Sequence, residues 1–317
     1  MCETPNMQTQ SDKVPSAEWR GTSKQAPRSV FSNFKSELAP PHEGGRAVPR
    51  APPEATSFAG LQERIDQALA RSFIYSLLAR AFEDPKPEGW QWLSTVGTHN
   101  TFRLALAALE RPTALRPAAA TLFAHLKPAQ FESFNADYLS AFGHTVRGDC
   151  PLNEIEYGDL KADPLFQPHR LADLGAFYRA FGLEIAEDAA ERQDHLCLEL
   201  EFMSVLAAKE AYALEHQLDV EHVDVCHQAQ KDFLREHLGR WTPAFTRRLA
   251  KIVGQGALGA LADFARQFIA SDCARFGVVP GSEDLLLRPV DESGESLCAS
   301  CGLANLPPGA TMAPGQV

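Results

Sequence analysis

The chain has 317 residues, of which 44% are hydrophobic, so a sizeable core can be buried. Its 41 acidic and 30 basic residues give a net charge of −11, which argues against a nucleic-acid-binding surface and would suit a basic partner. No apolar run is long enough to cross a membrane and no secretory signal opens the chain, so we expect a soluble, cytoplasmic protein with reduced cysteines and no membrane insertion.

Proline-rich segments flank a central region. Residues 1–57 contain eight of the 22 prolines, many Ser, Thr, Gln and Glu residues, and no apolar periodicity. Residues 281–317 are similar and end in LPPGATMAPGQV. Such segments cannot bury enough apolar surface to offset their chain entropy. We therefore predict disordered tails at 1–57 and 281–317 around an all-helical domain at 58–280.

Apolar residues in the central region recur with helical spacing. The predicted helices cover 61–77, closed by Pro85 and Pro87; 131–142, ended by Gly143; 171–181, ended by Gly182; and 258–268. No run has the β-branched composition and turn boundaries of a strand. The pattern therefore predicts an all-α fold, a single helical bundle domain.

The segment 194–218 differs because apolar side chains point around the whole helix in its first half. That pattern is typical of a central helix, and Asp194 is placed to cap its N-terminus. Residues 183–227 also carry twelve acidic residues against only Arg192 and Lys209, a net charge of −10. Such a run is commonly a solvated helix face, but an acidic rim around an apolar groove would bind a basic, apolar peptide.

The sequence contains no phosphate loop, dinucleotide fingerprint, nucleophile elbow or zinc-protease helix, so we predict no enzyme activity and no cofactor. Cys298 and Cys301 form a single C-x-x-C, whereas a structural zinc site needs four ligands. This pair is either a metal or redox site completed by other residues, or an exposed pair in a flexible tail.

Three segments, in order along the chain, resemble the TorD/DmsD/NarJ family of chaperones. Residues 191–195 (ERQDH), followed by LCLELEFM, are similar to the family's E-P-x-D-H hinge motif, with Arg192 in the place of proline. Residues 150–158 (CPLNEIEYG) resemble its loop before the middle helices, and residues 233–249 (FLREHLGRWTPAFTRRL) resemble its late helical pair.

The resemblance implies an all-helical cytoplasmic chaperone for molybdenum-cofactor oxidoreductases. Such a chaperone binds the twin-arginine signal peptide of the apo catalytic subunit and holds it for cofactor insertion before export. The hinge positions of the family correspond to Glu191, Asp194 and His195. Carboxylates pair well with arginine, so Glu201 is a further candidate for peptide binding.

Four residues are candidate walls of the apolar part of a peptide groove: Trp90, Trp92, Tyr157 and Met203.

Two alternatives stay open beside the chaperone role. The protein is a helical metal-binding or redox protein that uses Cys298 and Cys301 to deliver metal or sulfur to a client enzyme, or a maturation factor that itself holds molybdenum cofactor or a nucleotide. A homodimer is possible, because helical proteins of this kind can exchange elements between protomers.

Overall fold

Most of the residues that the structure describes lie in α-helices. The computed structural model describes residues 58–110, 112–143, 148–158, 166–187 and 191–288. The tail predicted at 1–57 and the pair Cys298 and Cys301 lie outside these ranges. The helices are α1 (Phe58–Phe82), α2 (Pro87–Leu93), α3 (Val96–Ala108), α4 (Pro112–His125), α5 (Phe131–Phe142), α6 (Phe166–Ala180), α7 (Leu196–Glu215), α8 (Val220–Glu236), α9 (Leu238–Val253) and α10 (Ala257–Arg275), with short 3-10 helices at Pro128–Gln130 and Glu154–Glu156.

The all-α prediction is confirmed for this part of the chain. Its β-structure is limited to isolated bridge residues, among them the antiparallel pairs Asn153 with His195 and Tyr157 with Leu287. Within the same ranges, none of the helices combines the length and the apolar character needed to cross a lipid bilayer.

The helix ends expected at glycine are also confirmed. Helix α5 ends at Phe142, and Gly143 follows with a φ of 62°. The chain turns after α6 at Gly182, whose φ is 73°. Glycine adopts this left-handed backbone without a steric penalty because it has no Cβ.

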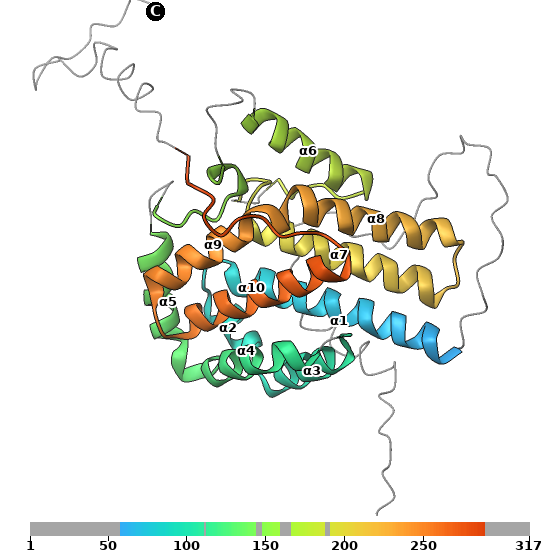
Figure 1. Ribbon diagram of the computed structural model, residues 1–317. Coiled ribbons are helices and arrows are strands. Elements are labelled where there is room, and N and C mark those ends of the chain that lie inside the picture. The colour runs from blue at the N-terminus through green and yellow to red at the C-terminus, as the bar shows by residue number, and fades with distance from the viewer. Residues whose placement is uncertain (1–57, 111, 144–147, 159–165, 188–190, 289–317) are drawn as a thin grey trace, which may run out of the picture.

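Helix α7 lies at the centre of the bundle. It packs most extensively against α1 and also against α8 and α9 (Figure 1). Helices α3 and α4 cover α1 and α10 on one side, and α6 lies on the opposite side, over α8. The prediction of a central helix after residue 194 is therefore confirmed.

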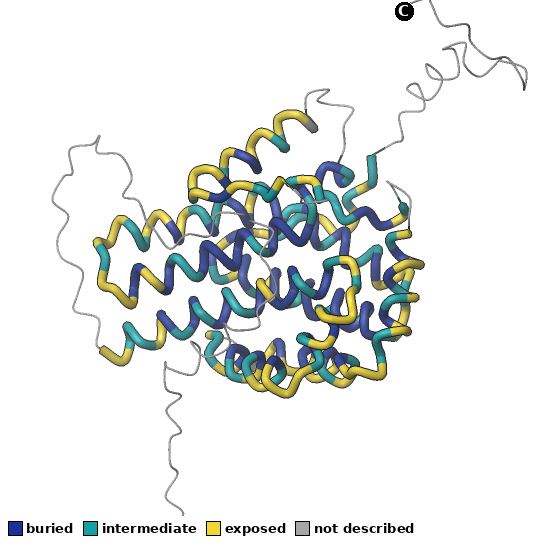
Figure 2. Tube along the Cα trace, turned by 180° about the vertical axis from the view of Figure 1, so that it is seen from behind, coloured by how far each residue is buried: buried dark blue, intermediate teal, exposed yellow. Residues whose placement is uncertain are grey.

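The hypothesis of an exposed apolar groove along this helix is wrong. Fifteen of the twenty residues of α7 are buried, and Figure 2 shows burial concentrated in the central helices and exposure at the periphery. The aromatic rings of Phe177 and Tyr178 on α6 pack against Phe202 and close the remaining side. Neighbouring helices thus cover the apolar surface that would have formed the groove.

The chain stays on the bundle beyond the predicted domain boundary at residue 280. Residues 281–288, called the strap below, continue from α10 across α9 to the loop at 150–158. The backbone N–H of Gly281 donates to the carbonyl of Gly239 (2.9 Å), and Leu285 and Leu287 pack against the core. The described fold therefore includes the first eight residues that we assigned to the C-terminal tail.

Candidate functional site

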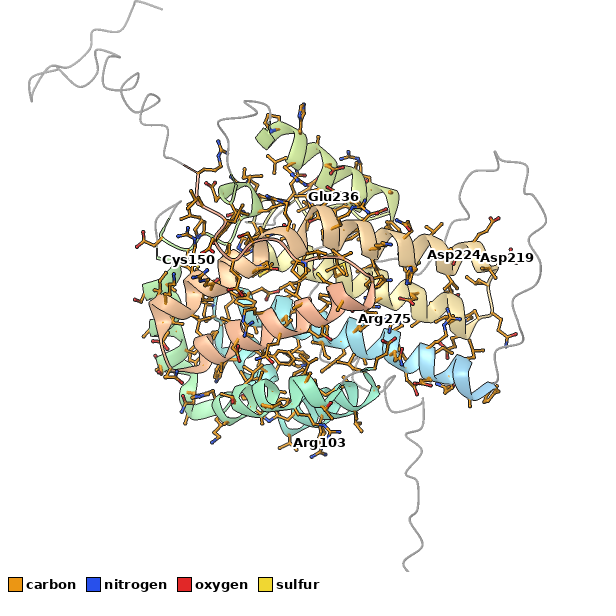
Figure 3. All side chains as sticks on the ribbon, viewed as in Figure 1. Arg103, Cys150, Asp219, Asp224, Glu236 and Arg275 are labelled. Atoms are coloured by element: carbon orange, nitrogen blue, oxygen red, sulfur yellow. The ribbon has the colours of Figure 1, made fainter. Side chains whose placement is uncertain are left out.

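The three segments that carry the family resemblance meet at one place. The hinge segment 191–195 runs beside the loop 150–158, where the backbone N–H of Glu154 donates to the carbonyl of Asp194 (2.9 Å). Arg240, on the first turn of α9, donates to the carboxylate of Glu154 (3.0 Å). Cys150, labelled in Figure 3, marks the start of the loop. We call the loop, the hinge segment and this turn of α9 the hinge site.

Asp194 is fully buried and holds the hinge segment to the loop. Its carboxylate accepts hydrogen bonds from the backbone N–H of Ile155 (3.2 Å) and the side-chain amide of Asn153 (3.2 Å). The prediction that Asp194 caps α7 is wrong by one residue. His195 is the cap, and its Nδ1 accepts the N–H of Cys197 (3.3 Å). Asp194 turns to the loop because the loop supplies these donors.

Arg192 stands where the family has proline, and its guanidinium forms ion pairs with two carboxylates. It donates to both carboxylate oxygens of Asp194 (2.5 and 3.0 Å), and its Nη2 lies 3.5 Å from the carboxylate of Glu156. A proline would restrict the backbone of the hinge segment. Here a guanidinium holds the segment to the loop through ion pairs instead.

Glu154 is the second buried carboxylate of the hinge site. His237 Nδ1 lies 2.9 Å from its Oε2, while Arg240 donates to Oε1 through Nε and Nη2 (3.2 and 3.0 Å). Burial disfavours the charged form. The hydrogen bond from His237 and the positive charges of Arg240 and Arg170 outweigh burial, so the pKa of Glu154 lies below its usual value.

Glu199 is the third buried carboxyl group, one turn into α7. Trp241 Nε1 donates to its Oε2 (3.0 Å), whereas Oε1 has no hydrogen-bond partner within the described residues. Burial and the negative charge of Glu154 raise the pKa of Glu199 well above its usual value and outweigh the hydrogen bond from Trp241. The fold therefore favours the protonated form of Glu199, next to Glu154, whose ionised form it favours.

Three carboxylates reach the surface beside the hinge segment, and we call Glu83, Glu191 and Glu201 the acidic group. All three are partly exposed. Glu83 binds Arg80 (3.2 Å) at the end of α1. Burial raises the pKa of Glu83 to about 6, and the charges of Glu201 and Glu191 add to the shift against the effect of Arg80. The structure thus brings together two of the predicted peptide-binding residues, and Glu83 is one that we did not predict.

His195 pairs with Asn153 of the loop in an isolated bridge and is partly exposed. Burial lowers its pKa, so the imidazole is neutral at pH 7. Because Nδ1 accepts the N–H of Cys197, the proton resides on Nε2. His195 can therefore present an N–H donor from the hinge segment.

The predicted groove walls do not form an open groove. Tyr157 and Met203 are fully buried and Trp90 is 4% exposed, so these side chains belong to the core. Trp92 is half-buried, with its ring 6.4 Å from that of Phe73. Large apolar side chains are more often part of the core than of a binding surface. Trp90, Tyr157 and Met203 follow this general tendency.

The acidic run at 183–227 is divided between distant places. Asp219 and Asp224 lie at the start of α8, at the opposite end of the bundle from Cys150 (Figure 3). Glu199 and Glu210 are buried inside it. The run therefore does not form one continuous rim.

A second buried polar cluster lies between α1, α7, α8 and α10. The guanidinium of Arg71 donates to Asp272 (2.6 and 2.9 Å), Glu210 (3.2 Å) and Gln230 (2.5 Å), and Tyr75 also donates to Asp272 (2.6 Å). These groups are buried and bind one another, which is typical of a structural network.

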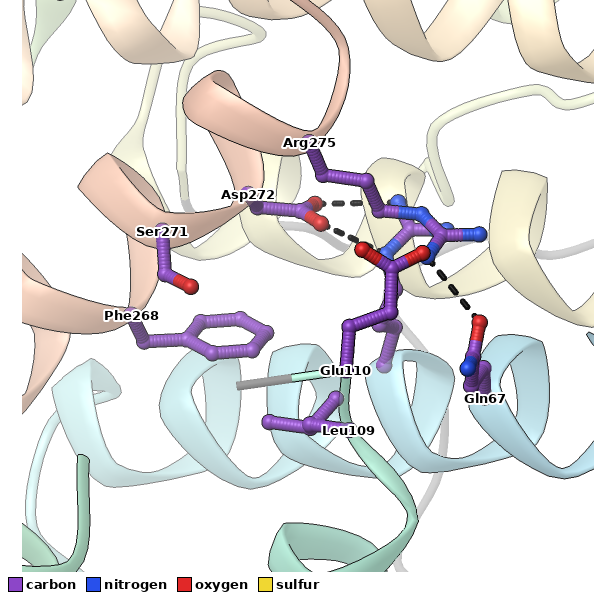
Figure 4. A pocket seen from close by; sticks show the side chains of 8 residues that line it. Gln67, Leu109, Glu110, Phe268, Ser271, Asp272 and Arg275 are labelled. Atoms are coloured by element: carbon purple, nitrogen blue, oxygen red, sulfur yellow. Dashed lines mark hydrogen bonds and ion pairs between the residues drawn. The ribbon is translucent and has the colours of Figure 1, made fainter. Parts of the chain in front are cut away.

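A small pocket opens beside this cluster (Figure 4). Arg275 spans it, binding the carboxylate of Glu110 and the side-chain oxygen of Gln67 (3.1 Å). The charged groups that line the pocket are thus engaged with each other.

The four cysteines in the described ranges are free thiols in the core: Cys150, Cys197, Cys226 and Cys273. Burial raises the pKa of Cys150 to about 12 and that of Cys226 to about 11, so both are protonated at neutral pH. Within those ranges, no three His, Cys, Asp or Glu side chains gather in a way that could hold a metal ion.

The chain is similar to known proteins over much of its length. Residues 109–247 match the family described as "Nitrate reductase delta subunit". The perchlorate reductase assembly chaperone protein of Dechloromonas aromatica is 32% identical over 216 residues, covering 65% of this chain and 90% of that protein. The chlorate reductase assembly chaperone protein of Ideonella dechloratans is 39% identical, covering 58% and 79%. The selenate reductase assembly chaperone protein of Thauera selenatis is 36% identical, covering 37% and 58%.

Proposed function

The chain belongs to the TorD/DmsD/NarJ family, and we propose that it is an assembly chaperone that binds the twin-arginine leader of an apo molybdenum-cofactor oxidoreductase. Three relatives carry the name of an assembly chaperone for a reductase of an oxyanion. A protein that must meet its client before export acts in the cytoplasm, and its task is to hold the client rather than to catalyse a reaction.

The acidic group is the observation that carries this proposal. Glu83, Glu191 and Glu201 lie close enough for their charges to raise the pKa of Glu83. Mutual repulsion among like charges costs free energy in the free protein, and the ion pair of Arg80 with Glu83 offsets part of that cost. A cationic ligand relieves that repulsion, and arginine binds carboxylates through two parallel hydrogen bonds. The pair of arginines in a leader peptide has the matching chemistry.

The buried members of the hinge site have a supporting role in this proposal. Asp194 and Glu154 are engaged with the loop and with α9, so they fix the position of the hinge segment. His195 adds an N–H donor near the acidic group. The peptide would contact Glu191, Glu201, Glu83 and His195, while Asp194 would act through the position of its neighbours.

Calorimetry of the full chain with a synthetic leader peptide tests the proposal. The peptide carries two adjacent arginines before an apolar stretch, and a matched peptide has glutamine at both positions. We expect the arginine peptide to bind at low ionic strength, to weaken as salt is added, and to exceed the glutamine peptide in affinity. Equal affinities, or no binding by either peptide, would contradict the proposal.

The alternative role in metal or sulfur delivery rests on Cys298 and Cys301 alone, which lie outside the described residues. Elemental analysis of protein purified without added metal distinguishes the two roles. A bound metal that is lost in the Cys298→Ser/Cys301→Ser variant would favour delivery, whereas a metal-free protein that binds the leader would favour the chaperone role.

A further inference from the structure

The strap pairs with the loop of the hinge site as a short piece of antiparallel β-structure. The backbone N–H of Gly158 donates to the carbonyl of Leu286 (2.9 Å), and that of Arg288 donates to the carbonyl of Glu156 (3.0 Å). Tyr157 and Leu287 face each other between these two hydrogen bonds. The loop therefore offers one donor and one acceptor to an extended segment, and the strap occupies both.

The side chains of the strap follow an alternating pattern. Leu285 and Leu287 pack against the core, Leu286 between them is 69% exposed, and Arg288 follows directly. Alternation of this kind is what an extended strand presents to a surface. Residues 285–288 of the strap thus form an extended apolar segment that ends in an arginine, held by backbone hydrogen bonds at the hinge site.

The strap is anchored at its start by a close backbone contact, and further along by two backbone hydrogen bonds to the loop and the partly buried Leu285 and Leu287. A Cβ on Gly281 would lie 1.9 Å from the carbonyl oxygen of Arg240, so only glycine permits this close approach of the backbones. Further along, Asp284 forms an exposed ion pair with Arg247 (2.5 Å), a type of contact that contributes little to stability. A competing strand would have to replace two backbone hydrogen bonds and the packing of two partly buried leucines, while the start of the strap stays in place.

We propose that the edge of the loop at residues 156–158 is a docking edge for an extended apolar–basic peptide, and that the strap is an internal ligand which this peptide displaces. The inference rests on the proposed function, because the occupant is the client leader. Its support is the chemistry of the strap, since a leader peptide also combines arginine with apolar residues. Addition of a strand to an exposed edge is a known mode of peptide recognition.

Displacement has a defined consequence for affinity. The loop needs a partner for the N–H of Gly158 and the carbonyl of Glu156, so the strap and the leader compete for the same two groups. Apparent affinity for the leader is then reduced by the fraction of molecules in which the edge is free. A weaker strap raises that fraction and tightens binding.

A pair of single variants of the full chain tests the competition. Leu287→Ser removes a packed side chain of the strap, and Leu286→Ser is the matched control because Leu286 is exposed. With a fluorescent arginine leader peptide, we expect Leu287→Ser to bind about tenfold more tightly than wild type and Leu286→Ser to bind equally. Equal affinity in all three proteins overturns the docking edge while leaving the proposed function intact.

The strap sequence itself is a second probe. A synthetic peptide of residues 282–291 (SEDLLLRPVD) should bind Leu287→Ser and should bind wild type at least tenfold more weakly. If the leader binds none of the proteins, the proposed function fails. The strap peptide still decides the docking edge, which is overturned when neither protein binds it.

Hydrogen exchange on the wild-type chain gives a test that does not depend on folding of a variant. On addition of the leader, the amide of Arg288 should lose protection because it leaves Glu156. The amide of Gly158 should stay protected because the peptide replaces Leu286 as acceptor. Unchanged protection of Arg288 under saturating leader would overturn the inference.

Discussion

Arg192 and Asp194 form a pair in which the guanidinium is 43% exposed and the carboxylate is fully buried. Two hydrogen bonds join them across two positions of the chain, and the same guanidinium lies 3.5 Å from Glu156 on the neighbouring loop. The hinge segment is therefore fixed from the solvent side by Arg192 and from the inside by Asp194. This arrangement places Glu191 and His195 at the surface on either side of a buried charge.

Removal of Arg192 should destabilise the fold. Arg192→Ala leaves the buried carboxylate of Asp194 with weaker compensation, and we expect the free energy of unfolding to fall by about 1–3 kcal/mol in urea titrations. Arg235→Ala is the control, because Arg235 forms its ion pairs at the exposed surface of α8 and should leave stability unchanged. Equal losses in both variants would show that Asp194 does not depend on Arg192.

Neutralisation of Glu154 in the hinge site should cost much more stability than neutralisation of the neighbouring Glu199. Glu154→Gln removes an ionised group that His237 and Arg240 bind, and at pH 7 we expect a loss of about 3 kcal/mol or more. Glu199→Gln replaces a carboxyl group whose neutral form the fold favours, and we expect it to cost less than about 1 kcal/mol. Chemical unfolding of the two variants at pH 7 measures both values, and a larger loss for Glu199→Gln would reverse the assignment.

Glu199 should also make stability depend on pH. Its pKa is raised in the folded state, so the unfolded chain releases this proton at a lower pH, near 4.3, than the folded protein does. Stability from this group is complete below that pH and is lost as pH rises, by up to about 1.4 kcal/mol per pH unit until the folded pKa is reached. The difference in stability between Glu199→Gln and wild type should therefore shift in favour of the variant from pH 5 to pH 8. Parallel curves would contradict a raised pKa.

Leader binding should weaken in mild acid. The pKa of Glu83 is raised to about 6, so this carboxylate is protonated in much of the free protein at pH 5.5. A cationic peptide prefers the ionised form, so we expect affinity at pH 5 to be about five- to tenfold weaker than at pH 7.5 at constant ionic strength. Fluorescence anisotropy measures this, and the Glu83→Gln variant should show a flatter dependence. An affinity that rises on acidification would exclude the role of Glu83.

The helical architecture could be predicted from the sequence because it depends on local patterns of residues. Apolar spacing and glycine located the ends of α5 and α6, and the run after residue 194 identified the central helix. The same run misled the assignment of Met203 to a groove, because a pattern of apolar residues does not say whether other helices cover it.

The hinge site could be predicted from the sequence only in part. The family resemblance located Glu191, Asp194 and His195, but Glu154 and His237 are 83 positions apart and no local pattern joins them. Composition also assigned the strap to a tail, since glycine and proline favour disorder on average. The role of Gly281 depends on one close contact with the backbone of Arg240, which only tertiary structure defines.

Binding of the leader to charge-matched variants tests the central claim most directly. Glu191→Gln/Glu201→Gln removes two negative charges of the acidic group, and Asp219→Asn/Asp224→Asn removes two at the opposite end of the bundle from Cys150 (Figure 3). At low ionic strength we expect the first variant to bind the arginine leader about tenfold more weakly than wild type and the second to bind within about twofold. Equal losses in both variants, or full affinity in the first, would contradict recognition of the leader by the acidic group.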